Sequence, residues 1–287
     1  MHSEMASVHH SSMNPLLAAQ DLRRWEGPIV VLDARSRALY EAGHLPGALH
    51  ADLESMLSAA AVAGHDPAQG GRHPLPALET WSLQLGGWGI APGIPVLVYD
   101  DAHGGNAAAR AWWMLRASGH VDSAVLDGGL QAALAEGFSL TSREESQPPA
   151  PPYPLTGWSL PLASMSEVAE RAGDAAWKVL DVRSGERWRG ETEPLDSVAG
   201  RIPGTRNLPW AENLGPDGRI KPVQELRGMY ERLLDGTPPE RLVVHCGSGV
   251  TACHTLLSLE AAGLSGAALY VGSWSEWSRS GREIARG

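Results

Sequence analysis

The chain contains one stretch of sequence twice. Residues 31–47 read VLDARSRALYEAGHLPG, and residues 179–188 read VLDVRSGERW, with AGRIPG following at 199–204. Two copies of one motif, about half the chain apart, indicate two tandem copies of one domain. The length of 287 residues agrees, since a domain takes roughly 150 residues.

The same order of patterns follows each copy of the motif. A short apolar run comes first, then an alanine-rich helical stretch, then a second apolar run. The first runs are 95–101 and 241–247, the helical stretches 106–119 and 250–263, and the second runs 123–129 and 267–273. Strands that alternate with helices predict the α/β class, with a parallel sheet flanked by helices in each half. Binding sites in such folds form at the carboxyl ends of the strands.

A proline-rich stretch lies near the middle of the chain. Residues 147–154 read QPPAPPYP, and proline restricts both its own backbone and the residue before it. We therefore expect an extended linker over 146–158. It separates an N-terminal domain over 15–145 from a C-terminal domain over 159–287.

The composition restricts the classes of partner. Lys and Arg number 23 against 33 Asp and Glu, a net charge of −10, which argues against nucleic acid and anionic membranes. No apolar run reaches the roughly 18–20 residues of a membrane span. The first fifteen residues have no apolar signal-peptide core. With only two cysteines a disulfide framework is excluded, so we expect a soluble cytoplasmic protein.

The second half has a cysteine at a strand-to-helix corner. Residues 242–252 read LVVHCGSGVTA, so an apolar strand ends at Cys246 and a helix is expected near Val250. Gly247 and Gly249 allow close backbone approach. The N–H groups of this loop and the helix start bind anions and favour a thiolate. Ser248 and Thr251 add neutral hydroxyl donors.

Several cysteine chemistries fail at this loop. A cysteine phosphatase needs an arginine at the position held by Ala252. A thiol protease needs a paired histidine, but His245 points to the opposite face of the strand and His254 lies in the helix. A zinc site needs more ligands. The remaining chemistry is sulfur transfer, in which the thiolate becomes a persulfide. Cys253 is expected in the core.

These motifs resemble those of two-domain rhodanese-type sulfurtransferases. The resemblance rests on GHLPGA at 43–48, GRIPGT at 200–205, CGSGVTA at 246–252 and GSWSEW at 272–277. It implies two tandem rhodanese-like domains, of which the second is catalytic. It also implies that no cofactor or metal is needed. Asp100 stands at the cysteine position of the first half, where it cannot carry sulfur.

The resemblance also bears on the sulfur donor. The loop is similar to that of 3-mercaptopyruvate sulfurtransferases, whereas the thiosulfate-using branch has charged residues after its cysteine. Arg187 matches the arginine that grips the donor carboxylate. A second arginine is expected at the position of Leu195, and Arg189 or Arg201 is a candidate to replace it.

Other residues match family positions with different roles. The resemblance implies a Ser–His–Asp relay made by Ser248, His44 and Asp52. Arg110 matches a motif interpreted as interdomain packing. Three residues of the C-terminal segment are interpreted as structural: Trp274, Glu276 and Trp277.

The resulting hypothesis is an enzyme that moves sulfur from 3-mercaptopyruvate to a thiol or cyanide through a Cys246 persulfide. The acceptor thiol is expected to be a thioredoxin-like protein or a small thiol. Backbone N–H groups of residues 247–251 stabilise the charge. The alternatives are a thiosulfate:cyanide sulfurtransferase and a non-enzymatic persulfide-binding or redox-sensing module.

Overall fold

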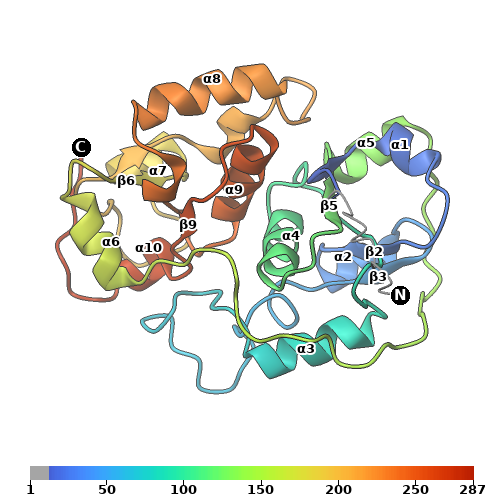
Figure 1. The fold of residues 1–287 in the computed structure, drawn as a ribbon. Helices are drawn as coiled ribbons and strands as arrows, with labels where there is room; N and C mark the ends of the chain where they lie inside the picture. The colour runs from blue at the N-terminus through green and yellow to red at the C-terminus, as the bar shows by residue number, and fades with distance from the viewer. Residues whose placement is uncertain (1–12) are drawn as a thin grey trace, which may run out of the picture.

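A computed structural model describes residues 13–287 of the chain. The prediction that the first fifteen residues contain no signal-peptide core falls mostly on residues 1–12, which lie outside this range. The described chain forms two α/β halves side by side, the N-terminal half in blue to green and the C-terminal half in yellow to red (Figure 1). Among the helices of residues 13–287, none combines the length and the apolarity needed to cross a membrane.

The N-terminal half is built on a five-stranded parallel sheet in the order β1-β5-β4-β2-β3. Its strands are β1 (Leu16–Leu17), β2 (Val30–Asp33), β3 (Ala48–His50), β4 (Val96–Tyr99) and β5 (Ser123–Leu126). Its helices are α1 (Ala19–Arg23), α2 (Arg37–Ala42), α3 (Leu78–Gly87), α4 (Ala107–Ala117) and α5 (Gly129–Ala135).

The C-terminal half has a four-stranded parallel sheet in the order β7-β6-β8-β9. Its strands are β6 (Lys178–Asp181), β7 (Arg206–Asn207), β8 (Leu242–His245) and β9 (Ala268–Leu269). Its helices are α6 (Met165–Ala172), α7 (Gly185–Arg189), α8 (Val223–Leu234), α9 (Thr251–Ala261) and α10 (Ser273–Trp277), with the 3-10 turns η1 (Trp210–Asn213) and η2 (Pro239–Arg241). The predicted fold class is confirmed.

The repeated sequence motif has a structural reason. In the first half Asp33 ends β2, and Arg35 bonds both Asp33, at 2.5 Å, and the carbonyl oxygen of Gly43. In the second half Arg183 bonds Asp181 at 2.7 Å and the carbonyl oxygen of Gly200 at 2.8 Å. The buried arginine of each VLDxR segment thus ties its strand to the glycine turn that follows. Because a buried charge needs a partner, the two parts of the motif occur together.

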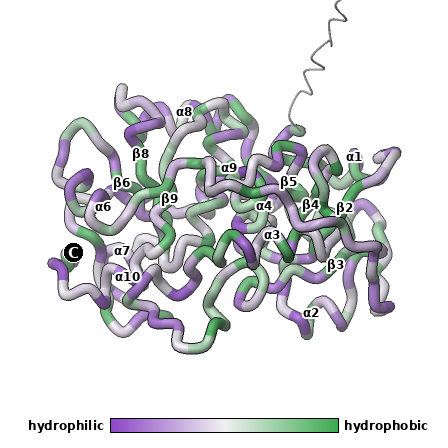
Figure 2. Tube along the Cα trace, turned by 60° about the horizontal axis from the view of Figure 1, so that its bottom comes forward, coloured by the Kyte–Doolittle hydropathy of each residue, from purple (hydrophilic) through white to green (hydrophobic). Residues whose placement is uncertain are grey.

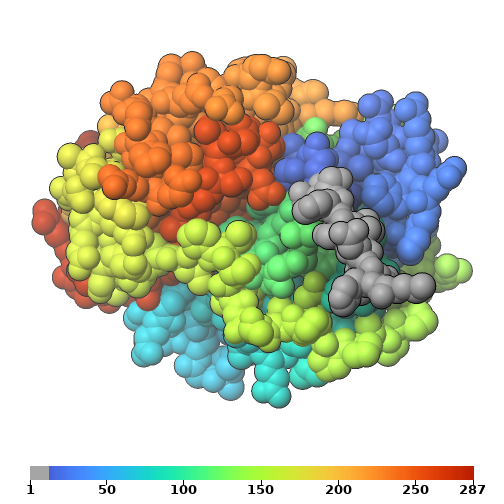
Figure 3. Space-filling view, in the orientation of Figure 1, coloured from blue at the N-terminus to red at the C-terminus, as the bar shows by residue number. Residues whose placement is uncertain are grey.

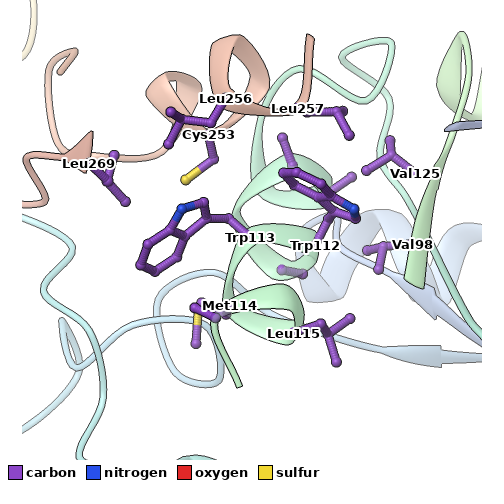
Figure 4. Packing of buried hydrophobic residues seen from close by; sticks show 14 of the residues in the cluster. Val98, Trp112, Trp113, Met114, Leu115, Val125, Cys253, Leu256, Leu257 and Leu269 are labelled. Atoms are coloured by element: carbon purple, nitrogen blue, oxygen red, sulfur yellow. The ribbon is translucent and has the colours of Figure 1, made fainter. Parts of the chain in front are cut away.

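Helices α4 and α9 pack against each other between the two halves (Figure 1). Trp112 and Trp113 of α4 are buried, and they lie beside Cys253, Leu256 and Leu257 of α9 (Figure 4). The apolar strands lie inside each half, as the hydropathy along the chain shows (Figure 2). One continuous apolar cluster therefore joins the halves, as expected for two domains that share a core.

Two long segments outside the sheets contact both halves. The proline-rich linker runs along α3, where the N–H of Ala150 bonds the carbonyl of Gly86 and that of Tyr153 bonds the carbonyl of Ser82. The segment between β3 and α3, residues 51–77, extends from the N-terminal half. In the space-filling view it forms the left part of the molecule's lower edge, in light blue to cyan (Figure 3). This segment supplies several residues of the site.

Candidate active site

Cys246 lies at the corner between strand β8 and helix α9. The strand ends at His245 and the helix begins at Thr251, close to the predicted boundaries. Gly249 makes the corner possible, since its φ is +72° and a Cβ atom there would lie 2.5 Å from the carbonyl oxygen of Val271. Cys246 is buried but lines a cavity of about 540 Å³. A small molecule can therefore reach its sulfur.

The loop after Cys246 presents free hydrogen-bond donors. Among residues 13–287, no acceptor pairs with the backbone N–H groups of residues 247–250. Gly247, Ser248, Val250 and Thr251 line the cavity with Cys246. Free N–H groups at a helix start attract negative charge. Gly249 does not line the cavity, and its role is to shape the corner.

Ser248 is bonded to a histidine of the other half. Its Oγ lies 2.8 Å from Nδ1 of His73, and Nε2 of His73 lies 2.8 Å from Oε1 of Glu54. A carboxylate only accepts, so Nε2 of a neutral His73 donates to Glu54 and Nδ1 accepts from the Ser248 hydroxyl. Burial lowers the pKa of His73, while the nearby Glu54 acts in the opposite direction. The imidazole is therefore neutral at neutral pH.

The relay expected through His44 and Asp52 is wrong in its geometry. His44 is buried and stacks on Tyr40 at 3.9 Å, and its Nδ1 lies 2.7 Å from the carbonyl oxygen of Tyr40. Asp52 accepts hydrogen bonds from the N–H and hydroxyl of Ser55. Neither residue lines the cavity. His44 is held in the glycine turn after α2. The long segment 51–77 brings His73 to Ser248 instead.

Two arginines from different halves converge on the loop. A Cβ atom placed on Gly247 would lie 3.3 Å from Nη2 of Arg187 and 3.3 Å from Nη2 of Arg72. Arg187 bonds Glu193 at 2.6 Å, and Arg72 pairs with Asp196. Both arginines line the cavity. Arg187 therefore lies beside the loop, and its role as the anchor of the donor stays a prediction.

The two arginines considered as substitutes at Leu195 lie elsewhere. Arg189 pairs with the exposed Glu191 at 2.6 Å. Arg201 lies over the ring of Trp188 and bonds the carbonyl of Gly287 at 2.6 Å. Neither lines the cavity, whereas Leu195 does.

The structure also places the remaining residues that the sequence motifs single out. Arg110 is fully buried and spans the halves, with bonds to the carbonyl oxygens of Gly249 at 3.1 Å and His73 at 3.0 Å. Cys253 is buried, and both cysteines are free thiols. Trp274 and Trp277 are buried, and Glu276 accepts a hydrogen bond from the N–H of Gly70 at 2.9 Å.

Three residues of the cavity are not among the predicted site residues: His73, Glu54 and Arg72. The available signal was Gly70-Gly71-Arg72-His73-Pro74, a glycine pair beside two cationic residues in a stretch without helix or strand periodicity. Within residues 13–287, His, Cys, Asp and Glu form no group of three or more suited to a metal ion. The cavity brings together a thiol, a hydroxyl–imidazole pair and two guanidinium groups.

Comparison with known proteins gives the family. Rhodanese-like domains match residues 18–136 and 164–280. A probable 3-mercaptopyruvate sulfurtransferase of Pseudomonas aeruginosa is 42% identical, over 91% of this chain and 94% of its own. A putative thiosulfate sulfurtransferase of Mycobacterium tuberculosis is 37% identical, over 91% and 92%. The 3-mercaptopyruvate sulfurtransferase structure from Leishmania major has a TM-score of 0.80 at 29% identity, over 95% and 76% of the two chains. The chain therefore belongs to the family of two-domain rhodanese-type sulfurtransferases.

Proposed function

We propose that the protein transfers sulfur from 3-mercaptopyruvate to a thiol or cyanide through a persulfide on Cys246. The Cys246 thiolate attacks the donor sulfur and the carbon–sulfur bond breaks. The bonding electrons leave with carbon as the enolate of pyruvate. The former thiol proton of the donor moves to this enolate, which leaves pyruvate and the Cys246 persulfide. An acceptor then takes the sulfur in a second step, as in other covalent mechanisms with two half-reactions.

The observation that carries the proposal is the set of free N–H groups beside Cys246. The backbone N–H groups of residues 247–250 have no acceptor among residues 13–287, and Gly247, Ser248 and Val250 line the cavity in which the sulfur lies. Negative charge develops first on the leaving group and then rests on the persulfide. Preorganised donors aimed at such charge lower the barrier, commonly by several kcal/mol per donor set.

The Ser248–His73 pair provides a route for the proton. With the Ser248 hydroxyl donating to His73, its lone pairs are free to accept the donor thiol proton. Neutral His73 can accept the Ser248 proton in turn and later return it. We therefore assign Ser248, His73 and Glu54 to proton transfer, in place of Ser248, His44 and Asp52.

Arg187 is the proposed anchor of the donor carboxylate. Glu193 fixes the guanidinium through its Nε and Nη2 atoms, and the arginine faces Gly247 beside the reactive sulfur. A charge-assisted bond to a carboxylate is about twice as strong as a neutral one. The remaining loop residues Gly247, Gly249, Val250 and Thr251 shape the pocket, and no cofactor takes part in the proposed steps.

Thiosulfate is the second candidate donor. A dianion needs more positive charge than a keto-acid, and two guanidinium groups beside Gly247 supply it. Against this, residues 247–251 contain no Lys or Arg. The neutral loop therefore favours 3-mercaptopyruvate.

The experiment compares kcat/KM for 3-mercaptopyruvate and thiosulfate, with cyanide as the common acceptor. We expect the larger value for 3-mercaptopyruvate. A Ser248→Lys variant should gain thiosulfate activity and lose 3-mercaptopyruvate activity. A larger wild-type value for thiosulfate would contradict the donor assignment, and no turnover of either donor would favour a persulfide-binding module instead.

The acceptor and the compartment are proposals as well. A small thiol or a thioredoxin-like protein fits the chemistry of persulfide transfer. We propose a cytoplasmic location, because both cysteines are free thiols and reducing compartments keep them so.

A further inference from the structure

The segment 51–77 is fixed against the C-terminal half by backbone contacts. The N–H of Gly70 bonds Glu276 at 2.9 Å, and the N–H of Arg72 bonds the Oγ of Ser275 at 3.0 Å. Gly71 fits closely between them, since a Cβ atom there would lie 2.4 Å from the carbonyl oxygen of Gly272. These contacts use backbone N–H groups, so they hold the backbone at position 72 in place when its side chain is substituted.

The Arg72 side chain is held with one face free. Its Nη1 atom donates to Asp196, whose other oxygen accepts from Arg279 at 2.7 Å. Its Nη2 atom points to the Gly247 side and has no hydrogen-bond partner in the described part of the chain. The side chain is 21% exposed, and that of Asp196 is fully buried. A buried carboxylate therefore orients a guanidinium whose free edge faces the cavity.

Arg187, on the opposite half, is also held by a buried carboxylate, here through its Nε and Nη2 atoms, and its Nη1 atom lies 3.7 Å from a Cβ position on Gly247. Its partner Glu193 is almost completely buried and also binds Arg183. The Nη2 atoms of Arg187 and Arg72 each lie 3.3 Å from one point, the position that a Cβ atom on Gly247 would take. Two guanidinium groups that approach one point from two sides fit a single oxyanion, since each supplies donors in a planar fork.

We infer that Arg72 binds an oxyanion of the sulfur donor together with Arg187, so that the N-terminal half completes the donor site. The inference rests on the proposed function for the identity of the donor. The shared chemistry is the carboxylate of 3-mercaptopyruvate or the sulfonate end of thiosulfate. Leu195, which lines the same cavity, then needs no cationic replacement within its own half.

Alkylation of Cys246 tests Arg72 without any turnover. Iodoacetate carries a carboxylate and iodoacetamide does not, so the ratio of their rates measures anion binding beside the sulfur. The rates are followed by mass spectrometry on full-length protein. In Arg72→Ala the ratio should fall about tenfold or more, and Arg72→Lys should restore part of it.

Arg279→Ala is the matched control. It removes the same charge and shares Asp196, but Arg279 does not line the cavity. Its ratio should stay near that of the wild type. An unchanged ratio in Arg72→Ala, or an equal fall in both variants, would overturn the inference.

Rescue and turnover separate this inference from the proposed function. Adding Leu195→Arg to Arg72→Ala should recover the alkylation ratio, because it places a cation in the same cavity. In turnover, Arg72→Ala should raise KM for the true donor and leave kcat nearly unchanged. If neither donor is turned over by wild type while the alkylation ratio still depends on Arg72, the proposed function fails and the anion site stands.

Discussion

The two halves contain the same strand-to-helix corner and use it differently. In the N-terminal half Asp100 follows β4, and its carboxylate accepts four backbone N–H bonds of 2.8 to 3.1 Å, from Ala102, Gly104, Asn106 and Ala108. In the C-terminal half Cys246 follows β8, and the N–H groups of residues 247–250 have no partner within residues 13–287. The corner is therefore an anion site in both halves. The residue after the strand decides whether the anion is a side chain of the protein, as with Asp100, or a bound molecule, as beside Cys246.

The surroundings of the two corners differ as well. The N-terminal corner is covered by the other half: a Cβ atom on Gly105 would lie 2.2 Å from the ring of Trp210, and one on Gly218 would lie 2.3 Å from His103. At the C-terminal corner, residues of the segment 51–77 border a cavity and bring Arg72 and His73 to it. The corner of the N-terminal half is thus covered, and its N–H groups are bonded to Asp100. The same half supplies Arg72 and His73 to the open corner of the C-terminal half.

The largest expected effect is the loss of the thiol. Cys246→Ser should show no sulfur transfer from either donor, because serine cannot form a persulfide. Cys253→Ser is the control. Burial raises the pKa of Cys253 to about 12, so its thiol stays protonated and the variant should keep its activity. Steady-state assays with cyanide measure both, and activity that survives Cys246→Ser would contradict the assignment.

Removal of the Arg187 guanidinium should have the next largest effect. A lost charge-assisted hydrogen bond costs roughly 1.5–3 kcal/mol, so KM for the donor should rise more than about tenfold in Arg187→Ala. Arg189→Ala is the matched control, since Arg189 pairs with Glu191 away from the cavity. Equal kinetics for Arg187→Ala and wild type would show that another group holds the donor.

Substitution of Asp100 removes the acceptor of the N–H groups at the N-terminal corner. Asp100→Ala leaves four buried or half-buried N–H groups without their acceptor, and each unsatisfied buried group costs about 1–3 kcal/mol. We expect a loss of stability on the order of 3 kcal/mol in urea unfolding, with kcat/KM of the folded protein nearly unchanged. Asp101→Ala, at an exposed neighbour, should stay within about 0.5 kcal/mol. A neutral effect of Asp100→Ala would contradict the anion-site comparison.

The pH profile tests the Ser248–His73 pair. Because burial lowers the pKa of His73 below its usual 6.5, the imidazole stays neutral at pH 7 and gains its proton only at lower pH. Protonated Nδ1 no longer accepts from Ser248, so kcat/KM should fall on the acid side of pH 6.5. In His73→Ala the activity should be lower throughout, and this acid limb should disappear. If His73→Ala showed the same fall of kcat/KM at acid pH, the fall would come from the titration of another group.

Local pattern predicted much of this molecule. The repeat, the strands and helices around 95–129 and 241–273, and the position of Cys246 all follow from short-range apolar periodicity and glycine placement. Confirmed family membership also agrees with these motifs. Such features depend on residues that are close together in the sequence, so the sequence alone predicts them.

The missing part of the site depends on long-range docking. His73 reaches Ser248, and Arg72 reaches Gly247, only because the segment 51–77 packs on α10 of the other half, whereas Glu54 bonds His73 within that segment. No periodicity marks that segment, and the family motifs point to His44 and Asp52 instead. The two arginines that face Gly247 also come from outside the loop, so the sequence of residues 247–251 does not include their charge.

The most direct test of the account is the mass of the sulfur-loaded protein. The protein is treated with 3-mercaptopyruvate without an acceptor, digested under non-reducing conditions and analysed by mass spectrometry. The account predicts a gain of about 32 Da, one sulfur atom bound to a cysteine thiolate nucleophile, on the peptide that contains Cys246, and its removal by cyanide. A gain on Cys253, or no gain on a protein that still turns the donor over, would contradict it.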